Sequence, residues 1–245
     1  MLHHRFIGDS NAKNLIIFLH EGLGCIEMWK DFPQKVVSAL NCYGLVYDRA
    51  GYGKSQGSLL DRDIDYLHKA AEELEEFINE LNLEDYNISL YGHSDGGSIA
   101  LIYAGRNSNT IKYLITEAAH GFVEQVTIDG VRAAIEPFNE GKLNGLSKFH
   151  GDRFEEVFWA WNNIWLDPRF ESWNILKELI VVENQSLIIQ GLDDQYGTPK
   201  QVEDIVTSIG ESASPLLIAG TGHSPHKTHA EEIIAALSRK FDWNE

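Results

Sequence analysis

The chain has 245 residues, of which 43% are hydrophobic and 23% are charged, a balance typical of an ordinary water-soluble folded protein. Its formal net charge of -17 makes nucleic acid a poor partner, because phosphate contacts need clustered lysine and arginine side chains. No run reaches the roughly 20 apolar residues that a membrane-spanning helix needs, so we do not expect a membrane protein.

The amino terminus and the cysteines bear on the cellular compartment. Residues 1–7 lack the long apolar segment of a secretory signal. The two cysteines, Cys25 and Cys42, are too few for a disulfide scaffold, and their spacing is not that of metal ligands. We therefore expect a cytoplasmic protein, without a nucleic-acid or membrane partner.

Apolar runs of strand length alternate with amphipathic segments of helix length along the chain. The strand-length runs lie at residues 14–19, 43–47, 88–91, 111–116, 186–190 and 215–219. The helix-length segments lie at residues 28–40, 63–81, 97–104, 199–209 and 229–241. This alternation predicts an α/β fold, in which helices cover both faces of a mainly parallel, doubly wound sheet.

Residues 122–182 interrupt the alternation and contain no convincing strand. Four of the six tryptophans lie in this stretch, at Trp159, Trp161, Trp165 and Trp173. We predict a helical cap inserted over the carboxyl ends of the strands, where an open α/β sheet binds ligands. The expected organisation is one core, formed by residues 1–121 and 183–245, with the cap at 122–182.

The motif GHSDG at residues 92–96 places a serine between two glycines. Glycines two positions before and after Ser94 leave room for a sharp strand-to-helix turn that exposes the hydroxyl group. The motif follows a predicted strand and precedes a predicted helix, which is the context that such a nucleophile elbow requires. Ser94 is therefore the candidate nucleophile.

A serine hydroxyl needs a base to remove its proton, and the base needs a carboxylate to hold it in place. Asp193 and Asp194 follow the predicted strand at 186–190, and His223 follows the strand at 215–219. Both strands end at the edge of the sheet where Ser94 is expected. The three groups occur in the order serine, acid, histidine, with intervals of about 100 and about 29 residues.

With these features the chain resembles the α/β-hydrolase fold enzymes over nearly its whole length. Residues 20–24 (HEGLG) resemble the family's HGxxG oxyanion loop, and residues 48–55 (DRAGYGKS) match its DRxGxGxS turn. The resemblance implies that Asp194 is the triad acid, because the family places the acid three residues after a glycine. Asp193 and Glu117 are the alternatives, the latter because some relatives carry an acid after the corresponding strand.

Attack on an ester carbonyl creates an oxyanion, which two preorganised backbone N–H groups stabilise. We expect one donor to be the amide of Asp95, the residue after the nucleophile. The other should come from the loop after His20, with Gly22 favoured and Leu23 as the alternative. Glu21 stands where the family commonly has glycine, so the position of the second donor is open between these two.

The side chains expected around the substrate are Glu21, His120, Trp159, Trp161 and Trp165. Glu21 and Asp95 place two carboxylates next to the nucleophile. Either they favour a neutral or cationic substrate or position a water, or both turn outward and accept from backbone N–H groups. An aromatic face recurs at helical spacing at Phe154, Phe158, Trp161 and Trp165, and it fits either core packing or a pocket wall.

Ten histidines compete for the role of the base, and His223 is the favoured one. We expect His20 to brace the oxyanion loop by hydrogen bonding. His120 and His150 lie at the edges of the cap, where packing, exposure and lining of the pocket are all open. The remaining histidines considered are expected to be solvated or to cap a helix, namely His3, His4, His93, His226 and His229.

Motifs for cofactors are missing from the sequence. It has no dinucleotide fingerprint, HExxH motif or paired-cysteine motif, so we expect neither a cofactor nor a metal. The favoured function is a serine hydrolase that acts on a small-molecule substrate, cleaving a small or medium, mostly apolar ester or lactone through an acyl-enzyme on Ser94. The alternatives are a carbon–carbon bond hydrolase of aromatic degradation, a proline iminopeptidase-like aminopeptidase, and a ligand receptor on a hydrolase fold.

Overall fold

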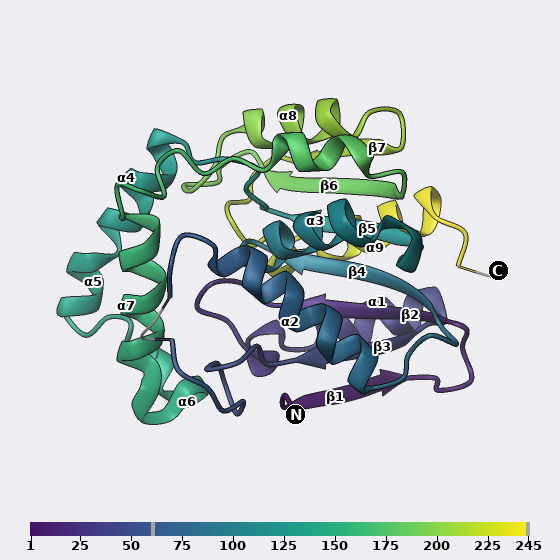
Figure 1. The fold of residues 1–245 in the computed structure, drawn as a ribbon, viewed down its shortest axis with the longest axis horizontal. Coiled ribbons are helices and arrows are strands. Elements are labelled where there is room, and N and C mark those ends of the chain that lie inside the picture. Colours follow the sequence, from purple (N-terminus) through teal and green to yellow (C-terminus); the bar gives the residue numbers. More distant parts are fainter. Residues whose placement is uncertain (60–61, 244–245) are drawn as a thin grey trace.

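A computed structural model describes residues 1–59 and 62–243 of the chain. Within these residues seven strands form one sheet in the order β1-β3-β2-β4-β5-β6-β7 (Figure 1). The strands are β1 (His4–Gly8), β2 (Asn14–Leu19), β3 (Tyr43–Tyr47), β4 (Asn87–His93), β5 (Tyr113–Glu117), β6 (Gln185–Gly191) and β7 (Ala213–Ile218). Strand β1 pairs antiparallel with β3, and the other neighbours pair in parallel. The expected mainly parallel α/β sheet is therefore confirmed.

The helices follow the predicted alternation. The α-helices are α1 (Phe32–Leu40), α2 (Tyr66–Glu80), α3 (Asp95–Asn107), α4 (Gln125–Ala133), α5 (Ile135–Asn139), α6 (Ser147–His150), α7 (Phe154–Trp165), α8 (Pro199–Ile209) and α9 (Ala230–Lys240). Short 3-10 helices are η1 (Ile26–Trp29), η2 (Ser108–Thr110), η3 (Asn144–Leu146), η4 (Gly151–Arg153), η5 (Leu176–Val181) and η6 (Pro225–Lys227).

Two elements differ from the sequence prediction. The helix expected at 28–40 is divided, because Pro33 lies in the first turn of α1, where a proline is tolerated, and a separate turn precedes it. Strand β1 was not predicted. It lies at the edge of the sheet and has no fully buried residue, so its sequence lacks the apolar run that marks the other strands.

The core has two layers because successive side chains of each strand point to opposite faces of the sheet. On β2, Leu15 and Ile17 contribute to the core beneath α2, α3 and α8, whereas Ile16 and Phe18 contribute to the core beneath α1 and α9. Both faces are therefore covered, as expected for a parallel sheet. This framework fixes the carboxyl ends of the strands in one row.

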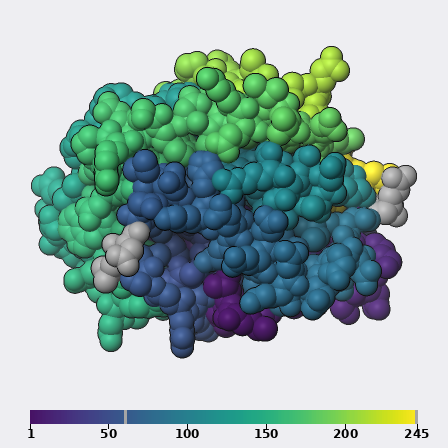
Figure 2. Space-filling view, viewed as in Figure 1, coloured from purple at the N-terminus to yellow at the C-terminus, as the bar shows by residue number. Residues whose placement is uncertain are grey.

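The segment between β5 and β6 gathers at that row of strand ends. In Figure 1, helices α4 to α7 lie beyond the arrowheads of β4 and β6, and Figure 2 shows the same green segment packed against the blue surface that precedes it in the chain. A β-bridge between Phe122 and Asn174 joins the two sides of this insertion. We propose residues 122–182 as the cap, with 1–121 and 183–245 as the core.

The described helices also bear on membrane insertion. None of the helices in the described ranges has both the length and the apolar character needed to cross a membrane.

Candidate active site

Ser94 occupies a strained turn between β4 and α3. Its backbone has φ 54° and ψ -119°, a conformation that residues other than glycine rarely adopt. The flanking glycines are required by close backbone contacts, since a β-carbon on Gly92 would lie 2.2 Å from the carbonyl oxygen of Gly96. A β-carbon on Gly96 would lie 2.1 Å from the carbonyl oxygen of Leu19. The GxSxG spacing therefore has the steric origin that the sequence suggested.

Three side chains from separate strand ends meet at this turn. His223 Nε2 lies 2.8 Å from Ser94 Oγ, and His223 Nδ1 lies 2.9 Å from each carboxylate oxygen of Asp194. The backbone N–H of Tyr196 donates to Asp194 Oδ1 at 2.8 Å and so holds the carboxylate in place. The arrangement is a hydrogen-bonded line from hydroxyl to imidazole to carboxylate.

The two alternative acids lie elsewhere. Asp193 is exposed, and its backbone N–H donates to the carbonyl oxygen of Thr221. Glu117 bonds to His226 rather than to His223. Of the three acids considered from the sequence, Asp194 is therefore the one that contacts His223.

Asp194 and His223 shift each other's pKa. Burial by itself lowers the pKa of His223, but the carboxylate of Asp194 outweighs burial, so the pKa lies above the ordinary value of 6.5. Burial raises the pKa of Asp194, yet its interactions with His223 reverse that effect and lower it below the usual range. An ionised carboxylate thus faces an imidazole that readily accepts a proton.

The loop after β2 is braced by His20, as predicted. Its Nδ1–H donates to the carbonyl oxygen of Glu21 at 2.8 Å, and its Nε2 accepts from the backbone N–H of Arg49 at 3.1 Å. Burial keeps the pKa of His20 well below its ordinary value, so the ring is neutral. The backbone N–H of Leu23 donates to Glu21 Oε2 at 2.9 Å. Of the two candidate donors in this loop, the N–H of Leu23 is therefore already engaged by a side-chain acceptor.

A cavity of about 60 Å³ lies next to Ser94. Its lining residues are Glu21, Leu23, Ser94, Asp95, His120, Thr127, Val131, Trp161, Trp165, Tyr196 and His223. Four of the five expected pocket residues therefore line it. The exception is Trp159, whose ring packs against Phe138 and Phe158 instead.

Three lining residues were missed in the sequence: Thr127 and Val131 on α4, and Tyr196 on the loop that carries Asp194. Thr127 and Val131 are four residues apart and so share one face of the helix, a spacing that could have marked them. A larger cavity, of about 480 Å³, lies between the amino termini of α1 and α9, and no triad side chain lines it. We therefore propose the smaller cavity as the site, because the candidate triad side chains meet there.

The two carboxylates beside Ser94 differ from each other. Glu21 accepts from the backbone N–H of Leu23, as one interpretation predicted, but it also lines the cavity. Asp95 was expected to turn outward in that interpretation, and this is wrong. Its side chain is 1% exposed, accepts from Trp165 Nε1 at 3.3 Å and lies 4.0 Å from Arg49 Nη1. The indole and the guanidinium draw it inward.

The aromatic face of α7 serves both predicted purposes. Phe158 is fully buried and stacks on Phe138, with ring centroids 3.7 Å apart. Trp161 and Trp165 are also buried, and both line the cavity next to Ser94. Core packing and a pocket wall are therefore both present on one helix.

The remaining histidines include two clear corrections. His93 and His226 were expected to be solvated or to cap a helix, but they are 2% and 4% exposed. His93 bonds to the carbonyl oxygen of His223, and His226 bonds to Glu117. His150 joins two loops, since its Nδ1 accepts from the N–H of Gly53 and its Nε2–H donates to the carbonyl oxygen of Leu23. His120 lines the cavity and bonds to the carbonyl oxygen of Tyr196 at 3.0 Å.

Comparisons with known proteins agree with this architecture. A family model described as the alpha/beta hydrolase family matches residues 16–236. No curated protein matches the chain significantly. Many solved structures share its fold, and three of them illustrate the range of enzymes among them.

The first is MGS-M2, an alpha/beta hydrolase enzyme from a Medee basin deep-sea metagenome library, with 19% identity, coverage of 100% of this chain and 97% of that chain, and a TM-score of 0.75. The second is a thermophilic esterase from Thermogutta terrifontis, with 18% identity, coverage of 97% and 92%, and a TM-score of 0.71. The third is the enol-lactonase from Burkholderia xenovorans LB400, with 15% identity, coverage of 97% and 95%, and a TM-score of 0.77. At these identities the likeness is one of fold.

Proposed function

We propose that this chain, which belongs to the alpha/beta hydrolase family and is a hydrolase, is a serine hydrolase that cleaves a small or medium, mostly apolar carboxylic ester or lactone. The observation that carries the proposal is the hydrogen-bonded line that joins Ser94 Oγ, His223 and Asp194. This line supplies a nucleophile, a base and an orienting acid in one place.

The mechanism follows from the distances in this line. Ser94 Oγ attacks the carbonyl carbon while His223 Nε2, 2.8 Å away, takes its proton. Asp194 holds the imidazole in the correct tautomer and stabilises the imidazolium that forms. His223 then returns the proton to the leaving group, and a water activated by the same base hydrolyses the acyl-enzyme.

The oxyanion is stabilised by two backbone amides in this proposal. Asp95 is the first residue of α3, so its N–H is one of those that a helix amino terminus leaves without an intrahelical partner. Gly22 provides the second amide, because the N–H of Leu23 is engaged by Glu21. Both donors are backbone groups next to the nucleophile, which is the arrangement that acyl transfer requires.

The cavity favours the smaller substrates in the proposed class. Its volume of about 60 Å³ is far below the roughly 300–1,000 Å³ of pockets that hold drug-sized ligands, which suits a short acyl group. The indoles of Trp161 and Trp165 and the side chain of Val131 give it an apolar wall. We therefore expect acetyl or propionyl esters to react faster than long-chain esters.

The test compares p-nitrophenyl acetate hydrolysis by the wild type, Ser94→Ala and Ser38→Ala. Ser38 is exposed on α1 and provides the matched control. We expect kcat to fall by at least about 10⁴-fold in Ser94→Ala and to stay at the wild-type value in Ser38→Ala. Unchanged turnover in folded Ser94→Ala would reject the serine mechanism.

A second candidate, an aminopeptidase acting on a small amino-terminal residue, is favoured by one specific contact. The carboxylate of Glu21 lines the cavity beside Ser94 and contributes to the raised pKa of His223, so its charge reaches the reaction site. Such a charge would attract the ammonium group of a substrate. Turnover of alanine or proline p-nitroanilide that disappears in Glu21→Gln, with acetate ester hydrolysis retained, would favour this candidate over the simple ester.

We also propose a cytoplasmic location. Cys25 and Cys42 are both buried and unpaired thiols in the structure, which suits a reducing compartment. Cell fractionation with an antibody against the protein tests this, and recovery in a secreted fraction would contradict it.

A further inference from the structure

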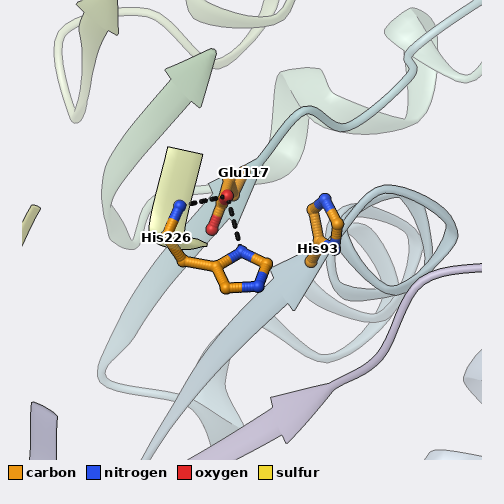
Figure 3. Close-up of side chains that lie close together, drawn as sticks. All are labelled: His93, Glu117 and His226. Atoms are coloured by element: carbon orange, nitrogen blue, oxygen red, sulfur yellow. Dashed lines mark hydrogen bonds and ion pairs between the residues drawn. The ribbon is translucent and has the colours of Figure 1, made fainter. Parts of the chain in front are cut away.

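A cluster of buried polar side chains lies behind the loop that carries His223. Tyr91 and His93 come from β4, Glu117 from the end of β5, and His226 from η6. All four are at most 4% exposed. Figure 3 shows His226 bonded to Glu117, with His93 to the right of the pair. The proposed triad does not use any of these side chains directly.

Glu117 holds the backbone at residue 226. Its Oε1 accepts from the backbone N–H of His226 at 2.9 Å and from Nδ1–H of the same residue at 2.8 Å. Its Oε2 accepts from the hydroxyl of Tyr91 at 2.6 Å. Burial opposes ionisation, but these partners, His226 first, lower the pKa of Glu117 to about 2. The charged carboxylate of Glu117, whose two oxygens both accept hydrogen bonds, thus fixes one end of the segment from His223 to His226.

His93 holds the same loop at residue 223. Its Nε2 lies 2.7 Å from the carbonyl oxygen of His223. A carbonyl oxygen only accepts, so Nε2 carries the proton of this hydrogen bond. Burial lowers the pKa of His93 to about 3, which keeps the ring neutral with its single proton at this position.

We propose that His93 and Glu117 are positioning residues that set where His223 stands relative to Ser94. They bond to the two ends of the segment from His223 to His226, one at a carbonyl oxygen and the other at an N–H. His93 is also the residue directly before the nucleophile, so one short stretch of backbone carries Ser94 and the anchor of its base. This inference rests on the proposed serine mechanism.

The same cluster has the composition of a metal site, since one potential ligand atom each from His93, Glu117 and His226 lies within 4.8 Å of the others. Hydrogen bonds argue for the positioning role instead. Both oxygens of Glu117 already accept from N–H or O–H groups, and Nε2 of His93 donates its proton to a carbonyl oxygen. A metal ion bound through these particular atoms would have to displace the hydrogen bonds.

The decisive experiment compares two amide side chains at position 93. In His93→Gln the amide nitrogen reaches about as far as Nε2 and can still donate to the carbonyl of His223, whereas in His93→Asn it falls short. We expect kcat for p-nitrophenyl acetate to stay within about 5-fold of wild type for Gln and to fall about 100-fold for Asn. KM should change less than 2-fold in both variants, because residue 93 does not line the cavity next to Ser94.

Separate controls test whether each variant folds and whether the serine mechanism holds. Each variant is first shown to have a cooperative thermal transition, and Ser94→Ala is assayed beside them. If Ser94→Ala is inactive and folded His93→Asn retains wild-type kcat, or if Gln and Asn lose activity equally, the positioning role is wrong while the serine mechanism stands. If Ser94→Ala keeps full activity, the serine mechanism itself fails.

A metal titration tests the alternative that this cluster binds a metal ion. We expect calorimetry with Zn²⁺ to give no stoichiometric binding to the wild type and EDTA to leave kcat unchanged. Binding of one Zn²⁺ per chain that is lost in Glu117→Gln would instead identify a metal site and overturn the positioning role.

Discussion

The indole of Trp161 lies directly against Gly22 of the loop after β2. A β-carbon on Gly22 would stand 2.5 Å from Trp161 Cδ1, closer than a β-carbon comes to a non-bonded atom. Trp161 belongs to α7 in the proposed cap, and Gly22 belongs to the loop that supplies our second oxyanion donor. The proposed cap and the loop after β2 are therefore packed so closely at position 22 that only glycine fits.

This contact predicts that Gly22→Ala lowers kcat/KM by about 10-fold or more, because the added methyl displaces either the loop or the indole. In a Trp161→Ala background the same substitution should cost less than about 3-fold, since the obstructing ring is gone. The measurement is a double-mutant cycle on p-nitrophenyl acetate hydrolysis. Gly145→Ala is the control, because a β-carbon there meets nothing within 4 Å. Equal losses in both backgrounds would contradict steric coupling.

The raised pKa of His223 predicts the acid side of the pH profile. The imidazole accepts a proton only when neutral, so kcat/KM should rise with pH and reach half its plateau above pH 6.5. Asp194 causes the increase against the opposing effect of burial. Asp194→Asn should therefore move the midpoint to lower pH and reduce kcat by about 10⁴-fold. A midpoint that does not move in this variant would disagree with the assigned acid.

The two hydrogen bonds of the His150 ring predict that this side chain stabilises the proposed cap. Its ring bridges the N–H of Gly53 and the carbonyl oxygen of Leu23 at 3.0 and 2.9 Å. His150→Ala leaves both backbone groups without this partner, so we expect the free energy of unfolding to fall by roughly 2 kcal/mol. Amide hydrogen exchange in α6 and α7 should become faster. His229→Ala serves as the control, because the ring that it removes bonds to the hydroxyl of Thr228 and to no backbone group among residues 1–59 and 62–243.

The lowered pKa of Glu117 predicts how the free energy of unfolding changes at acid pH. Its pKa is about 2 in the folded chain against an ordinary 4.5, so its stabilisation is present above about pH 4.5 and is lost as the pH falls toward 2. The difference corresponds to roughly 3 kcal/mol. Urea unfolding at pH 5 and pH 2.5 should therefore show a smaller loss of stability for Glu117→Gln than for the wild type. An identical pH dependence would show that the carboxylate is not held in its charged form.

Much of the fold could be predicted because burial on both faces leaves a strong pattern. Strands β2 and β3 and helix α8 begin and end at the predicted residues, since their apolar runs are bounded by polar or turn residues. The residues of the candidate triad could be predicted equally well. Its members follow strands, so the topology alone brings them to one edge of the sheet, and the glycine spacing identifies Ser94.

The orientation of single side chains could not be predicted in the same way. Trp159 and Trp161 are two positions apart on α7, which places them about 200° apart around the helix, and only the second meets the cavity. His226 pairs with Glu117, 109 residues earlier in the chain, and this depends on how two strand ends meet. The available signal was that Glu117 ends one strand and His226 follows another at the same edge of the sheet.

The most direct test of the serine mechanism is covalent labelling with a fluorophosphonate followed by peptide mass spectrometry. We predict one phosphonyl group per chain, on Ser94, with labelling strongly slowed in His223→Ala and absent in Ser94→Ala. A label on another residue, or equal labelling of wild type and Ser94→Ala, would contradict the assignment of Ser94 as the nucleophile.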